Sequence, residues 1–170
     1  MMRPKFEPLR LTCLALCAIL GWSAAARADL LVSDDFGSQV VRYDAATGAF
    51  LSTLIPFDPN GPLQGAIGMR LDANGDLLVT SQYANSILRY DLFSGAFLGT
   101  FASNDTTPNT HLSNPADLVW GPDHNLYVAN FAGSSVDRFA ADGTSQGPYT
   151  ITAGSGVTIN GTASAIFGPD

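Results

Sequence analysis

A short motif recurs three times along this 170-residue chain, and it constrains the fold more than any other feature. The segment Asp-Leu-Leu-Val begins at Asp29 and again 47 residues later at Asp76, and a looser copy, Asn-Leu-Tyr-Val, begins 49 residues further on at Asn125. A period of this length, with strand-like content in every unit, is typical of arrays of small β-sheets, above all the blades of a β-propeller. The repeat therefore predicts an architecture and says little about chemistry.

The middle repeat indicates how one unit becomes a blade. Its apolar and β-branched runs are short, and the segments between them are rich in Asp, Asn and Gly, which favour tight turns. Because no segment after the leader has apolar residues at helical spacing, we expect an all-β fold: a partial β-propeller of about three four-stranded antiparallel blades, preceded by a signal-peptide helix. The strands expected in the middle blade cover residues 67–71, 77–80, 86–90 and 96–101.

The first 28 residues have the pattern of a secretory signal peptide. Basic residues in the first ten positions are followed by an apolar stretch over 11–22 and by an Ala-x-Ala cleavage signal that ends at Ala28. Such a stretch is too short for a stable membrane anchor. We therefore predict cleavage after Ala28 and a secreted or periplasmic protein. Both cysteines, Cys13 and Cys17, lie in this leader, so no disulfide is expected after it.

Removing the leader makes the chain strongly acidic. The leader holds four of the eight basic residues and one of the fifteen acidic ones, which leaves four arginines against fourteen aspartates and a net charge of −10 over residues 29–170. Nucleic acid and anionic membranes are disfavoured as partners, because phosphate binding needs clustered cations. The acidity is compatible with Ca²⁺ binding and equally with a solvated acidic surface.

The repeats divide the chain after the leader into units at 29–64, 65–113 and 114–160, and 161–170 matches the start of a fourth. Residues 165–170 repeat the pattern of 118–123 at a spacing of 47. Since about three blades would leave blade faces and strand edges uncovered, we expect either part of a longer propeller or a dimer of half-propellers.

Two phrases carry a family resemblance. Residues 68–79 and 117–130 look like NHL-type repeats, and the sequence of residues 42–51 resembles that of secreted bacterial proteins of this type. The resemblance covers residues 29–170 and implies a six-bladed propeller. It is weak for function, since such propellers host ligand binding, lactone hydrolysis and lyase chemistry alike.

Candidate ligand-binding residues lie in the loops expected at one end of the central channel. Asn114, Asp117 and Asn130 could converge there as oxygen donors, and Asn114 and Asp117 could hold a hard cation such as Ca²⁺. The competing interpretation is that these residues cap turns. The recurring arginines, at the same place in each unit, are expected to serve the blades by pairing with Asp44 or Asp91 or by covering an aromatic ring.

No catalytic residues are predicted. His111 and His124 lack the spacing of a metal pair, and no nucleophile elbow or phosphate-binding loop is present. The expected function is a non-catalytic scaffold that binds a protein or carbohydrate through its loops. The alternative is a metal-dependent lactonase or lyase like those of the gluconolactonase and streptogramin-lyase propellers. The lactonase set that the resemblance implies includes a Glu, and the chain after the leader has none.

Overall fold

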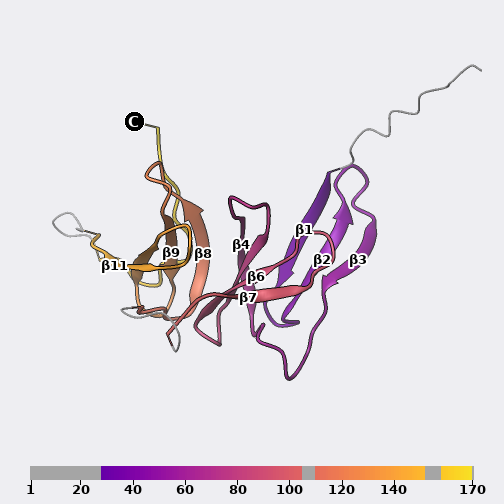
Figure 1. The fold of residues 1–170 in the computed structure, drawn as a ribbon, viewed down its shortest axis with the longest axis horizontal. Helices are drawn as coiled ribbons and strands as arrows, with labels where there is room; N and C mark the ends of the chain where they lie inside the picture. Colours follow the sequence, from indigo (N-terminus) through magenta and orange to yellow (C-terminus); the bar gives the residue numbers. More distant parts are fainter. Residues whose placement is uncertain (1–27, 105–109, 152–157, 170) are drawn as a thin grey trace, which may run out of the picture.

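The computed structural model of the chain describes residues 28–104, 110–151 and 158–169 (Figure 1). The predicted leader, except for Ala28, lies outside the described residues. Within them every regular element is a β-strand and none is a helix. None of the described segments forms a helix long and apolar enough to cross a membrane. The all-β prediction is confirmed.

The strands form three antiparallel sheets whose spatial order follows the sequence. The first sheet holds β1 (Asp29–Asp34), β2 (Gln39–Asp44) and β3 (Phe50–Ile55). The second holds β4 (Ala66–Leu71), β5 (Leu77–Ser81), β6 (Ser86–Tyr90) and β7 (Phe97–Ser103). The third holds β8 (Pro115–Trp120), β9 (Leu126–Asn130), β10 (Ser135–Phe139) and β11 (Ser145–Tyr149).

The three sheets stand side by side as an arc (Figure 1). Strand β4 packs against both β1 and β8, so the first strand of each complete sheet lies on the inner side of the arc. The first sheet and the C-terminal segment, residues 158–169, occupy opposite ends of the arc. Small antiparallel sheets stacked around an axis are the architecture of a partial β-propeller.

Two apolar clusters hold the sheets together, and they are built alike. In the first, Leu77 and Val79 of β5 pack against Leu54 and Ile55 of β3. In the second, Leu126 and Val128 of β9 pack with side chains of the second sheet, Phe101 among them. Because burying one such side chain contributes about 1.5–3 kcal/mol, the junctions between sheets are a main source of stability.

The first sheet lacks one strand in comparison with the other two. By the sequence repeat, β1 corresponds to β5 and β9, each of which pairs with a preceding strand, β4 or β8. Among the described residues, β1 has a ladder partner on one side only, which is β2. Residues 161–169, the described part of the predicted start of a fourth unit, contain no strand, although Phe167 packs edge-on against Tyr127 with ring centroids 4.9 Å apart.

Two of the recurring arginines, Arg42 and Arg89, pair with carboxylates that the sequence reasoning did not name. Arg89 Nε lies 3.0 Å from Asp72 Oδ2, and Arg42 Nε lies 3.2 Å from Asp29 Oδ2. The expected partner of Arg89 caps its own turn instead, because Asp91 accepts hydrogen bonds from the backbone and hydroxyl of Ser94. The aromatic contact is as predicted, with the Arg89 guanidinium 5.5 Å from the centre of the Phe101 ring.

Candidate ligand-binding loops

One hydrogen bond recurs at the side of the arc that holds the β1–β2, β5–β6 and β9–β10 turns, here called the loop end. It ties each of these turns to the segment that follows the last strand of the same sheet. The turn residues Ser38, Asn85 and Ser134 all have positive φ, between 46° and 48°. Their side-chain oxygens accept the backbone N–H groups of Gly65, Asn114 and Gly161, respectively, at 2.8–2.9 Å. The repeat of the sequence is therefore also a repeat of this bond.

Asn114, the first of the three predicted ligand residues, occupies a position that two glycines occupy elsewhere. Its φ is 51°, and those of Gly65 and Gly161 are 73° and 68°. Asparagine is one of the few residues other than glycine that adopts this left-handed conformation readily. Its N–H bonds to Asn85 and its carbonyl accepts the N–H of Phe131 at 3.0 Å. The backbone of Asn114 thus connects two sheets.

Asp117, the second predicted residue, lies on the inner strand β8. Its Oδ1 accepts the backbone N–H of Leu118 at 2.8 Å, and its Oδ2 accepts the hydroxyl of Ser164. Ser164 stands 47 residues after Asp117, which is the spacing of the repeat. The side chain therefore connects β8 to the equivalent position of the C-terminal segment.

Asn130, the third predicted residue, is fully buried. Its Oδ1 accepts the N–H of Ser113 at 3.1 Å, and its Nδ2 donates to Ser135 at 3.4 Å and to Asp137 Oδ2 at 3.3 Å. Ser81 holds the same place in the second sheet and likewise accepts a loop N–H, that of Gln64, at 2.7 Å. The three predicted residues thus have separate hydrogen-bond partners.

Asp137 is a buried carboxylate that the sequence reasoning missed. It is 1 % exposed, and its Oδ1 has no hydrogen bond of acceptable geometry among the described residues. Burial raises the pKa of the Asp137 carboxyl, and the Asn130 amide and nearby His111 oppose that increase. The repeats contained a signal, because the equivalent positions hold Val41 and Leu88 and only the third unit has a charge there.

Exposed aromatic rings are the second feature of this end. The β1–β2, β5–β6 and β9–β10 connections each carry one, at Phe36, Tyr83 and Phe131, with exposed fractions of 93 %, 51 % and 52 %. The Tyr83 hydroxyl donates to Asp35 Oδ2 at 3.2 Å, so the second connection reaches the first. Aromatic rings in adjacent loops offer flat apolar faces to a ligand.

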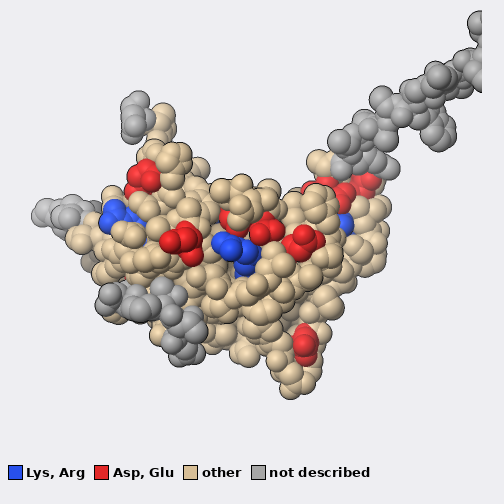
Figure 2. All heavy atoms as spheres, in the orientation of Figure 1, with Lys and Arg blue, Asp and Glu red and all other residues tan. Residues whose placement is uncertain are grey.

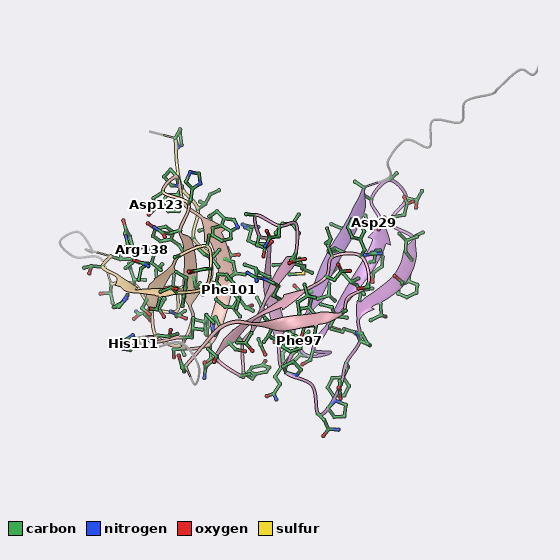
Figure 3. All side chains as sticks on the ribbon, viewed as in Figure 1. Asp29, Phe97, Phe101, His111, Asp123 and Arg138 are labelled. Carbon is green, nitrogen blue, oxygen red and sulfur yellow. The ribbon has the colours of Figure 1, made fainter. Side chains whose placement is uncertain are left out.

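The two histidines lie on either side of β8, at opposite ends of the strands of the third sheet. Exposed His111 lies at the loop end, shown low in Figure 3, and exposed His124 lies in the turn after β8 at the opposite end, where Asp123 is labelled. No group of three or more His, Cys, Asp or Glu side chains in the described part of the chain is arranged to hold a metal ion. The Ca²⁺ prediction relied on amide oxygens as well and stays a prediction.

A groove lies between the first two sheets, away from the loop end. It encloses about 600 Å³ and has apolar walls that include Leu31, Met69 and Leu77, with Arg42 and Arg70 at its margin. On the face shown in Figure 2, most charged side chains lie in the upper half of the molecule, and the loop end, which is at the bottom, is mostly uncharged. The loop end therefore differs in chemistry from the side of the arc that holds the groove.

No protein-family profile matches this chain, and no curated protein matches its sequence. Solved structures match its fold. A protein of unknown function from Bacteroides caccae superposes with a TM-score of 0.57 at 18 % identity, over 71 % of this chain and 45 % of that one. A catalytically inactive virginiamycin B lyase from Staphylococcus aureus, solved with quinupristin, gives 0.54 at 18 % identity, over 74 % of this chain and 39 % of the lyase.

A further streptogramin B lyase structure matches with a TM-score of 0.54 at 18 % identity, over 75 % of this chain and 38 % of that chain. The chain thus spans less than half the length of each of these proteins. These propeller-like neighbours support a β-propeller fold for the chain. At this level of identity the likeness extends to the fold alone.

Proposed function

We propose that the chain is a secreted or periplasmic, NHL-like propeller scaffold that binds a carbohydrate or protein ligand through its loop end without catalysing a reaction. The observation that carries the proposal is the exposed aromatic ring on each of the three connections, Phe36, Tyr83 and Phe131. Rings of this kind give large, rigid contact area at low entropic cost. The loop end visible in Figure 2 is mostly uncharged, and Asp35 beside Tyr83 offers a carboxylate that can accept a hydroxyl, so we favour a neutral, hydroxyl-rich ligand such as a polysaccharide.

The polar residues of the loop end support a scaffold function. The side-chain oxygens of Asn130 and Asp117 accept hydrogen bonds from groups of the chain itself, and the Asn85 oxygen holds Asn114. A side chain engaged in this way positions a loop. Rigid loops that present aromatic residues lower the entropy cost of binding.

Affinity electrophoresis through gels that contain a panel of neutral polysaccharides tests this proposal. We expect one of them to retard the chain, and expect replacement of all three aromatic residues by alanine to abolish the retardation. Phe93→Ala is the matched control, because Phe93 is 82 % exposed and lines the groove at the opposite end. Equal retardation of the triple variant and the control would contradict the proposed site. A protein ligand instead predicts no retardation and loss of a protein complex in the triple variant only.

Calcium binding at Asn114 and Asp117 is a further part of the proposal. A cation at Asp117 would compete with the Ser164 hydroxyl for Oδ2. Isothermal calorimetry with CaCl₂ measures the binding directly, and we expect Asp117→Asn to remove the heat. Absence of heat from the unsubstituted chain would exclude this calcium site.

Lyase activity is the second candidate function, with the lactonase as its hydrolytic counterpart. Its support is the fold likeness to two lyase structures, together with exposed His111 beside the buried carboxyl of Asp137. Chromatography of quinupristin after incubation with the chain tests it. A product that appears with the unsubstituted chain and is lost in His111→Ala would favour the lyase over the scaffold.

A further inference from the structure

The two ends of the arc carry complementary halves of the junction that joins the sheets inside the chain. Within residues 28–104, 110–151 and 158–169, the β1 edge at one end has no partner strand, and at the other end the C-terminal segment lies in the place of an inner strand and also has none. We propose that a second copy of this chain docks end to end, so that residues 162–167 of each copy add to the β1 edge of the other. This inference is independent of the proposed ligand.

The apolar side chains of β1 are uncovered in comparison with their repeats. Leu30 is 53 % exposed, whereas the equivalent Leu77 and Leu126 are 3 % and 0 % exposed. Val32 is 40 % exposed, and its equivalents are fully buried. In the complete sheets these positions pack on the preceding sheet and lie beside an inner strand. Strand β1 therefore presents one half of a junction.

The third sheet presents the other half. One position in the last strand of each sheet is equivalent across the three sheets, because it pairs with the same position of the preceding strand. The pairs are Ile55 with Val40, Ala102 with Ile87, and Tyr149 with Val136. Ile55 and Ala102 are 4 % and 0 % exposed because the next sheet covers them, but Tyr149 is 45 % exposed. The outward face of the third sheet thus lacks a covering sheet among the described residues.

The C-terminal segment is already seated as an inner strand would be. Gly161 donates its N–H to Ser134 at 2.9 Å, just as Gly65 and Asn114 bond to their own turn residues at the start of β4 and β8. Ser164 bonds to Asp117, and Phe167 packs on Tyr127. Ile166 is 89 % exposed, which leaves the segment open to a partner strand.

The repeat fixes the register of the new ladder. Leu118 pairs with Val128 in β8 and β9, and Met69 pairs with Val79 in β4 and β5. Their equivalents are Ala165 in the C-terminal segment and Val32 in β1. The segment of one copy therefore pairs Ala165 with Val32 of the other copy, with the strands antiparallel.

Docking at both ends closes the assembly. Each three-sheet copy would supply the missing inner strand of the other, which gives a ring of six sheets (2 × 3), all with four strands. A rotation that closes after two copies yields a defined dimer, whereas one that does not close yields filaments. Propellers typically have about four to eight blades, so a ring of six sheets lies within the usual range.

Disulfide cross-linking of the full 170-residue chain tests the register. Cys13 and Cys17 are first replaced by serine, and Ala165→Cys and Val32→Cys are introduced into separate chains. Residues directly opposite in an antiparallel ladder are close enough for a disulfide. We expect a cross-linked dimer when the two chains are mixed and oxidised. Ala165→Cys mixed with Phe50→Cys, on exposed β3, is the control and should not cross-link.

Light scattering of the full chain tests the assembly separately. We expect twice the monomer mass, and expect Leu30→Asp to give a monomer with the strand content of the unsubstituted chain by circular dichroism. Leu51→Asp is the matched control, because Leu51 is 47 % exposed but lies on β3, and it should stay dimeric. A monomeric unsubstituted chain, an open series of oligomers or equal cross-linking in the Phe50 control would overturn the proposal.

Discussion

The side-chain oxygen of Asn85 accepts the backbone N–H of Asn114 at 2.8 Å, and this single bond joins the turn of one sheet to the entry of the next. Both residues have positive φ, at 48° and 51°. The Ser38–Gly65 and Ser134–Gly161 pairs repeat the arrangement with a hydroxyl as acceptor. A position expected to bind a ligand is thus part of the connection between blades.

Replacing Asn85 with alanine should lower the free energy of unfolding by about 2 kcal/mol. The variant loses the acceptor for a half-buried N–H and places a Cβ-bearing residue of low left-handed propensity at positive φ. Asn85→Gly removes the acceptor alone and should cost about 1 kcal/mol. Urea unfolding measures both values. Equal losses in the two variants would show that backbone conformation contributes nothing at this turn.

Arg89 should stabilise the second sheet chiefly by compensating a buried carboxylate. The Asp72 side chain is 3 % exposed, and Arg89 Nε is 3.0 Å from it but outside hydrogen-bond geometry, so the attraction is mainly coulombic. Arg89→Met keeps the apolar stem and should cost about 1–2 kcal/mol, less than a fully buried pair because the arginine is partly exposed. The Arg89→Met/Asp72→Asn double variant should recover most of this loss of unfolding free energy, as measured by denaturant titration. Arg70→Met, at an exposed position, is the control and should change stability by less than about 0.5 kcal/mol.

The strands of the middle repeat could be predicted from the sequence because their signals are local. Expected strands at 67–71, 77–80, 86–90 and 96–101 became 66–71, 77–81, 86–90 and 97–103. Alternating apolar residues and the Asp, Asn and Gly of the turns determine those bounds within a few residues of chain.

The partners of the polar side chains could not be predicted because they depend on packing between strands and sheets. Asp91 follows Arg89 closely in sequence, yet it caps its own turn and leaves the arginine to Asp72, 17 positions earlier. Asn114 is the instructive case at the candidate site. Comparison with the glycines at 65 and 161 explains its positive φ, whereas cation binding by its side chain stays a prediction.

Gly68 should tolerate no side chain, because β4 and β8 approach closely there. A Cβ at Gly68 would lie 2.7 Å from the Ala116 carbonyl oxygen and 2.9 Å from Asp117 Cα, both of them backbone atoms. Gly68→Ala should therefore separate the inner strands and destabilise the chain by about 1–3 kcal/mol. Gly168→Ala is the control, since nothing lies within 4 Å of its added Cβ. Thermal unfolding followed by circular dichroism compares them, and a neutral Gly68→Ala would mean that the strands separate without cost.

Asp137 should make the chain more stable on mild acidification. Burial raises the pKa of its carboxyl in the folded state above the value in the unfolded chain. Between the unfolded and folded pKa values the folded state binds more protons, so stability from this group rises as pH falls through that interval and is lost again as pH increases. Other carboxylates act in the opposite sense, because turn hydrogen bonds lower the pKa of Asp91 and Asp123.

The contribution of Asp137 is isolated by comparing the chain with Asp137→Asn. The amide retains an oxygen that can accept the Asn130 Nδ2–H group, now at 3.3 Å, and it cannot ionise. We expect the variant to be more stable than the parent above the folded pKa, with a difference that shrinks as pH falls from 7 toward 3.8, the ordinary pKa of an aspartate. Urea midpoints measured across that range test this. A difference that grows on acidification would mean that the Asp137 carboxylate is stabilised as an anion in the folded chain, and a constant difference would mean that its pKa is the same in the folded and unfolded chain.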